Sequence, residues 1–98
     1  MSQFTTRVEL HDAVWSDYTK LHQQMAARGF RQTVTAVNGA VYELPPAEYD
    51  YEGTATRAQV LEMAKEAAKS VKSSFAVITT ESAGRTWYNL KLLKKAAA

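Results

Sequence analysis

Apolar and polar residues alternate at the start of the chain, and the spacing then becomes helical. In residues 4–10 one side carries Phe4, Thr6, Val8 and Leu10 and the other side is polar, which predicts a strand with one buried face. Asp12 stands where a helix N-cap belongs, and Gly29 suits the left-handed residue that ends a helix. Between them, one helical face carries Val14, Tyr18, Leu21 and Met25.

Two further strands are predicted at residues 30–37 and 40–44. Asn38-Gly39 between them predicts a two-residue type I′ turn, which pairs Val37 with Ala40. Both faces of this hairpin carry apolar residues, so the pattern allows either face to be buried.

The second half of the chain repeats the order of strand and helix. Pro45-Pro46 ends the third strand, and we expect residues 47–55 to form a loop. Thr56 with Gln59 matches a capping box, so a second helix begins at Arg57. Its apolar face carries Val60, Ala64, Ala67 and Val71. Residues 75–80 predict a central strand, residues 86–93 predict a fifth strand at an edge, and residues 94–98 predict a frayed tail.

This order of elements predicts an α+β fold of the ferredoxin-like βαββαβ type. In that fold two helices cover one face of a single antiparallel sheet. A chain of 98 residues with 46% hydrophobic residues supports one core, so we expect one domain spanning residues 1–98. The opposite face of the sheet would be open to a second subunit, another protein or a nucleic acid.

Composition narrows the class of protein. The chain contains no cysteine, which excludes disulfides, thiolate catalysis and cysteine-based zinc sites. It has no long apolar run and no secretory leader pattern, so we expect a cytoplasmic protein without membrane association.

Charge is distributed unevenly along the chain. The net charge is +2, but residues 1–56 carry four bases and seven acids, while residues 57–98 carry eight bases and three acids. A basic second half suits an anionic partner, and it equally suits head-to-tail self-association or a solvated lysine surface.

His11-Asp12 is the first candidate site, because it follows the first strand at the edge of the sheet. The histidine could move protons and the carboxylate could bind a divalent cation, or Asp12 could simply cap the helix. The spacing of His11 and His22 fits no metal site, so we predict neither a metal centre nor a cofactor.

Tyr49 and Tyr51 form the second candidate site, in the predicted loop. They could anchor a protein partner or stack on bases, or they could cover the edge of the fold.

The third candidate interleaves aromatic and basic residues near the C-terminus. Arg85, Trp87, Tyr88 and Lys91 combine side chains that neutralise phosphates with side chains that stack on bases, as single-stranded RNA platforms do. The alternative is an edge strand that closes the core or a dimer interface. Four arginines are further candidates for phosphate contact: Arg7, Arg28, Arg31 and Arg57.

Several short segments resemble the GhoS antitoxins, a family of small bacterial proteins. They are residues 4–11, Arg28-Gly29-Phe30, Leu44-Pro45, residues 47–53, Thr56-Arg57 and Gln59-Val60. The resemblance covers about residues 4–90. It implies a ferredoxin-like endoribonuclease, similar to the small nuclease subunit of CRISPR adaptation complexes. The founding antitoxin cleaves the messenger RNA of a membrane-disrupting toxin, but the family has no strict catalytic motif to place on this chain.

The leading hypothesis is therefore an RNA-binding, antitoxin-like regulator with endoribonuclease activity that acts as a homodimer. We predict catalytic roles for His11, Asp12, Arg28, Arg57 and Tyr88. We predict nucleic-acid contacts for Arg7, Arg31, Arg85, Trp87 and Lys91, and a partner interface at Tyr49 and Tyr51. The alternative is a non-catalytic module that regulates a protein partner through the open sheet face and the tyrosines.

Overall fold

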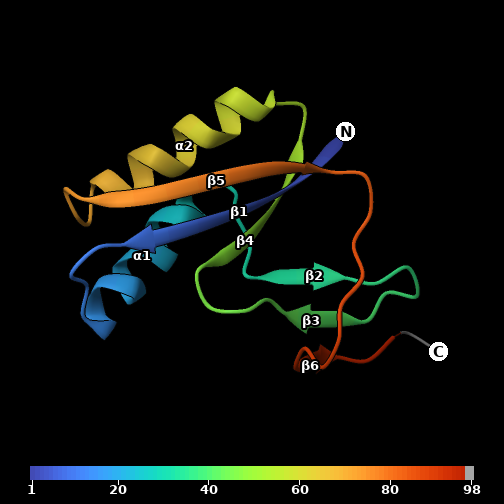
Figure 1. Ribbon diagram of the computed structural model, residues 1–98. Helices are drawn as coiled ribbons and strands as arrows, with labels where there is room; N and C mark the ends of the chain where they lie inside the picture. The colour runs from blue at the N-terminus through green and yellow to red at the C-terminus, as the bar shows by residue number, and fades with distance from the viewer. Residues whose placement is uncertain (97–98) are drawn as a thin grey trace.

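The computed structural model describes residues 1–96, which fold into two helices and two three-stranded antiparallel sheets (Figure 1). The elements are β1 (Ser2–Leu10), α1 (Trp15–Ala27), β2 (Thr33–Thr35), β3 (Val41–Glu43), β4 (Glu48–Gly53), α2 (Arg57–Lys69), β5 (Phe75–Ser82) and β6 (Leu92–Lys94). The α+β class is confirmed, but the expected single sheet is wrong. Lys94 belongs to β6 and not to a frayed tail, and residues 97 and 98 of that predicted tail lie outside the described residues.

The first sheet has the order β4-β1-β5, with β1 at its centre. The alternation predicted for β1 is confirmed, because Phe4, Val8 and Leu10 are buried among the core residues. Both helices pack on this side of the sheet, and α2 contacts β1, β5 and α1. Figure 1 shows the second sheet, β2-β3-β6, on the side of the molecule away from α2.

The second helix begins as the capping box predicts. The amide of Gln59 donates to the Thr56 hydroxyl at 3.1 Å, and the Gln59 side chain accepts from the Thr56 amide at 2.8 Å. Val60, Ala64 and Ala67 are fully buried, so the alanines bring the helix close to the sheet.

The first helix ends as predicted and begins differently. Gly29 has a φ of +89°, and the amides of Gly29 and Phe30 donate back into the last turn, which is a Schellman motif. Asp12 is not the N-cap as expected, because it lies before the helix with a φ of +51°. The cap is Val14, whose amide donates to Asp17 at 3.0 Å.

Residues 47–55 were expected to form a loop, and this is wrong. Residues 48–53 form β4, which pairs antiparallel with β1 and places Tyr49 opposite Thr6. Acids and aromatic residues alternate here, so the acids lie on one face and the tyrosines on the other. Tyr49 is 1% exposed and Tyr51 packs on Phe30 with ring centroids 5.3 Å apart. Tyr49 is therefore a core residue and not an exposed interface anchor.

The hairpin of the second sheet differs from the prediction by one residue. Thr35 lies opposite Val41 and the Ala36 amide donates to the Ala40 carbonyl at 2.7 Å, so three residues, 37–39, form the loop and not two. The Gly39 amide donates to the Ala36 carbonyl at 2.9 Å, and Gly39 has a φ of +91°. This is a type I turn followed by a left-handed glycine, the usual three-residue hairpin.

The predicted second and fifth strands are also shorter than expected. Within residues 30–37 only Thr33–Thr35 form β2, and Arg31 adds an isolated bridge to Asp50 of β4. Within residues 86–93 only Leu92 and Leu93 lie in a strand, because β6 pairs with β3.

Candidate functional site

A buried carboxylate holds two of the arginines that we predicted to contact nucleic acid. Asp50 is 3% exposed and lies on the face of β4 that points away from the helices. It accepts from Arg31 Nη2 at 2.6 Å and from the guanidinium of Arg85. The carboxylate offsets one of the two positive charges, and both guanidinium groups already have a hydrogen-bond partner.

The C-terminal segment covers part of the face that we expected to be open. Figure 1 shows the chain running from β5 past β2 and β3 to β6. Trp87 of this segment packs on Tyr42 with ring centroids 5.3 Å apart, and Arg85 binds Asp50. The face remains open over β5, where the Ile78 side chain is 63% exposed.

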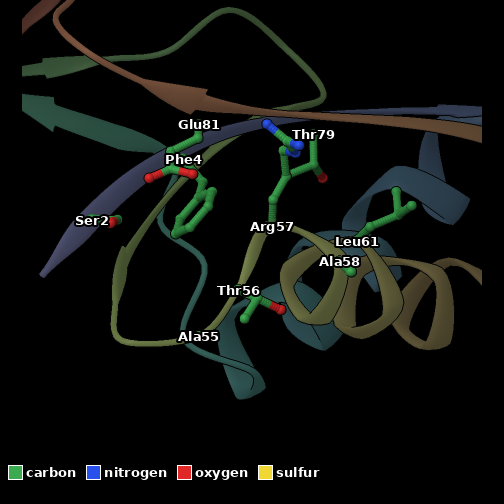
Figure 2. Close-up of a pocket in the computed structure, with 9 residues that line it drawn as sticks. All are labelled: Ser2, Phe4, Ala55, Thr56, Arg57, Ala58, Leu61, Thr79 and Glu81. Atoms are coloured by element: carbon green, nitrogen blue, oxygen red, sulfur yellow. The ribbon is translucent and has the colours of Figure 1, made fainter.

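The five predicted catalytic residues do not form one site. His11 and Asp12 follow the C-terminal end of β1, whereas Arg57 and Ser2 line a groove at the other end of that strand (Figure 2). β1 has nine residues, which span about 27 Å, so these two groups of predicted catalytic residues lie far apart. Arg28 lies at the end of α1 and donates to Gln24.

Tyr88, the fifth of these residues, is 92% exposed in the segment between the two sheets. Lys91 is exposed in the same segment. The structure therefore does not bring the catalytic set together. Arg85, Trp87 and Tyr88 of the third candidate do line one cavity of about 510 Å³, and Lys91 is not among its lining residues.

A cleft lies where β4 stops pairing with β1. Paired strand residues end at Arg7, and beyond them the Val8 amide donates to the Ala47 carbonyl at 3.0 Å. The Leu10 amide donates to the Tyr18 hydroxyl at 3.1 Å. The gap between this edge and α1 is a cavity of about 250 Å³ lined by Arg7, Val8, Glu9, Trp15, Tyr18, His22, Pro46 and Ala47. We call it the β1-edge cleft.

His22 is fixed at the cleft by a buried phenol. Its Nδ1 lies 2.6 Å from the hydroxyl of Tyr49. Burial lowers the pKa of His22, so the neutral imidazole is favoured. Burial, together with the nearby Tyr18, raises the pKa of Tyr49, so the phenol keeps its proton. When the phenol donates to Nδ1, the Nε2–H of His22 remains as a hydrogen-bond donor for the cleft.

Trp15 is the most exposed large aromatic side chain of this cleft. It is the first residue of α1 and is 80% exposed. No function was predicted from the sequence for Trp15, His22, Tyr18 or Glu9. The available signal was a tryptophan that lies beside the apolar stripe of α1 and not on it, which indicates a side chain that the core does not use.

A run of hydrogen-bonding groups leads from the cleft to the end of β1. Glu9 lines the cleft, and its Oε1 lies 3.3 Å from Nε2 of His11. Nδ1 of His11 lies 2.7 Å from the Ser74 hydroxyl. His11 is thus joined to the cleft through Glu9, while Asp12 has no assigned role there.

Within residues 1–96, no three histidine or acidic side chains are placed to hold a metal ion together. Neither helix of that part of the chain has the length and apolar character needed to cross a membrane. No protein-family model, curated protein or solved structure matches this chain. The resemblance to the GhoS antitoxins therefore stays a prediction.

Proposed function

We propose that this chain binds single-stranded RNA and that the β1-edge cleft is where a base is held. Trp15 offers an exposed aromatic face for stacking, and Arg7 offers a cation for the adjoining phosphate. His22 and Tyr18 add hydrogen-bonding groups at fixed positions. The observation that carries the proposal is this convergence of an unused tryptophan, an arginine and a neutral histidine on one small cavity.

We also propose that the first sheet belongs to a ferredoxin-like arrangement. The sheet order β4-β1-β5 and the bridge between Arg31 and Asp50 on the outer side of β4 support it. In that arrangement the β2–β3 hairpin begins beside β4 and then turns away into the second sheet.

RNA cleavage and an antitoxin-like regulatory role are the further part of this proposal, and they rest on the resemblance. Metal-independent cleavage needs a proton acceptor, a proton donor and a cation near the scissile phosphate. His22, His11 and Arg7 supply these residue types in and beside the cleft. The toxin transcript expected for a GhoS-like protein is the natural substrate class to test.

The test measures binding of labelled U-rich and A-rich RNA by fluorescence anisotropy. We expect Trp15→Ala to weaken binding about fivefold or more, because a base stacked on an aromatic ring contributes about 1–3 kcal/mol. Tyr88→Ala is the matched control, since it removes an equally exposed aromatic ring outside the cleft. Equal losses in both variants, or no binding by the unmodified protein, would overturn the proposal.

The same RNA is then incubated with the protein, with and without a chelator, to test cleavage. Cleavage through this cleft is expected to be lost in His22→Gln and to persist with chelator. Cleavage that survives both His22→Gln and His11→Gln would exclude the assigned acid and base.

A second candidate function is binding of a protein partner through the open face of the first sheet. The observation that favours it is that Arg31 and Arg85 share the Asp50 carboxylate, so the three groups together carry a net charge of +1 and not +2. The salt dependence of the binding affinity distinguishes the two functions, because contacts to phosphates weaken steeply as the salt concentration rises. A partner held through the apolar Ile78 surface would bind almost equally at low and moderate salt.

A further inference from the structure

Strand β5 has a long unpaired edge. It lies at the end of the β4-β1-β5 order, and within residues 1–96 no strand pairs with its outer side. Its eight residues contain no proline and no base, and its register with β1 runs without a bulge. Proteins usually protect such edges with lysines, prolines or bulges, and β5 has none of these although it carries Glu81, so its edge is suited to pairing.

The hydrogen bonds to β1 show which backbone groups of β5 point outward. The His11 amide donates to the Ser74 carbonyl at 3.1 Å. In an antiparallel pair, every second residue bonds to the same neighbour. Ala76, Ile78 and Thr80 therefore pair with β1, and the outward groups belong to the residues between and beside them, which are Phe75, Val77, Thr79 and Glu81.

We propose that two copies of this chain pair through β5, antiparallel, with the twofold axis at Ile78. In this register Phe75 lies opposite Glu81 of the second copy, and Val77 lies opposite Thr79. Only this symmetric register gives all four outward residues a hydrogen-bonded partner among themselves. The β4-β1-β5 sheet of one copy and the same sheet of the second copy then form one continuous sheet of six strands.

Side chains on both faces fit this pairing. On the open face, Ile78 is 63% exposed and meets its own copy across the axis, where burial of an apolar side chain is favourable. Glu81 faces Phe75 and not a second Glu81, so the register places no like charges opposite each other.

On the helix side, the pairing runs beside a groove. A cavity of about 670 Å³ lies between β5 and the start of α2, and Phe4, Leu61, Thr79 and Glu81 are among its lining residues. Figure 2 shows Arg57 reaching across it from α2 toward the strand that carries Thr79. Phe75 and Glu81 both lie on this side, because their β1 partners are the buried Leu10 and Phe4. The Phe75 ring of the second copy, which packs on its own core, would therefore lie next to Glu81.

Cross-linking tests the register directly, because the chain contains no cysteine. Ile78→Cys places two thiols across the axis in a non-hydrogen-bonded pair, where Cα atoms are about 4.5 Å apart and a disulfide fits. We expect a covalent dimer on mild oxidation. Ala76→Cys is the matched control on the same face, because its copy would lie about 14 Å away. The register is wrong if both variants cross-link equally or neither does.

Sedimentation of the protein without RNA tests the surface independently. We expect the unmodified protein to dimerise as its concentration rises, and Ile78→Lys to remain a monomer because two ammonium groups would meet at the axis. Circular dichroism checks that the variant keeps its fold. An unmodified protein that stays monomeric, or a dimer that Ile78→Lys leaves intact, would overturn the proposal. Neither result depends on whether the β1-edge cleft binds RNA.

Discussion

Nδ1 of His22 and the hydroxyl of Tyr49 lie 2.6 Å apart, and this hydrogen bond joins α1 to β4. The phenol is in the core, whereas the imidazole lines the β1-edge cleft. A single contact thus connects the packing of the fold with the orientation of a candidate functional side chain.

Tyr49→Phe is expected to lower the free energy of unfolding by about 1 kcal/mol. The ring still fills the core, but Nδ1 of His22 loses its hydrogen-bond partner. Urea denaturation at neutral pH measures the change. Tyr88→Phe removes the same hydroxyl from a side chain that is 92% exposed, and it should leave stability unchanged. Equal effects in the two variants would contradict a stabilising role for the Tyr49 hydroxyl.

The free energy of unfolding is expected to decrease as the pH falls, and part of this decrease is expected to come from protonation of His22. Burial lowers the pKa of His22 below its ordinary value of 6.5, so the unfolded chain takes up a proton more readily than the folded one. The stabilisation is therefore present above pH 6.5 and is lost as the pH falls through the lowered pKa.

Comparison with His22→Gln isolates this effect, because glutamine can still accept from Tyr49 while it does not titrate. His11 is present in both proteins, so its contribution cancels in the difference. The unfolding free energy of His22→Gln should decline less between pH 7 and the acid range. Parallel pH profiles would show that protonation of His22 does not oppose folding.

Asp50→Asn is expected to lower the free energy of unfolding by about 3 kcal/mol. The variant leaves Arg85 beside a neutral amide in a largely buried position, and an uncompensated buried charge is costly. Denaturation by urea measures the loss. Glu52→Gln is the control, since this neighbouring acid on β4 is exposed and should change stability by less than about 0.5 kcal/mol.

Gly39→Ala is expected to destabilise the protein by about 1 kcal/mol, because Gly39 has a φ of +91° that a Cβ disfavours. A Cβ there would meet no neighbouring atom, so the cost arises from the backbone alone. Gly84→Ala has equally free space and no such φ, and it should leave stability nearly unchanged. A thermal melt of both variants distinguishes the two sites, and a loss in Gly84→Ala as large as in Gly39→Ala would refute the explanation.

Local patterns predicted the helices and β1 well, but residues 75–80, which we expected to form a central strand, belong to β5 at the edge of the first sheet. The capping box at Thr56, the left-handed Gly29 and the alternation in β1 each depend on residues that are close in sequence. Such features follow from local hydrogen bonding and from the side chains that share one face of an element.

Position 49 shows where local reasoning was misleading. Acids at residues 48, 50 and 52 and two preceding prolines indicated a loop, but the tyrosines between the acids form the buried face of β4. Pairing with β1 provides that face, and β1 lies more than forty residues earlier in the chain.

The pairing of the arginines and the position of the β1-edge cleft likewise depend on contacts between segments that are distant in sequence. Sequence alone determined that the chain has two amphipathic helices, antiparallel strands and a basic second half, because each is a property of neighbouring residues. Tertiary structure alone assigned Arg31 and Arg85 to Asp50, left Trp15 exposed, and placed His22 beside Tyr49. These relationships depend on which strands pair and in what register, and that choice minimises the free energy of the whole chain and not of any single segment.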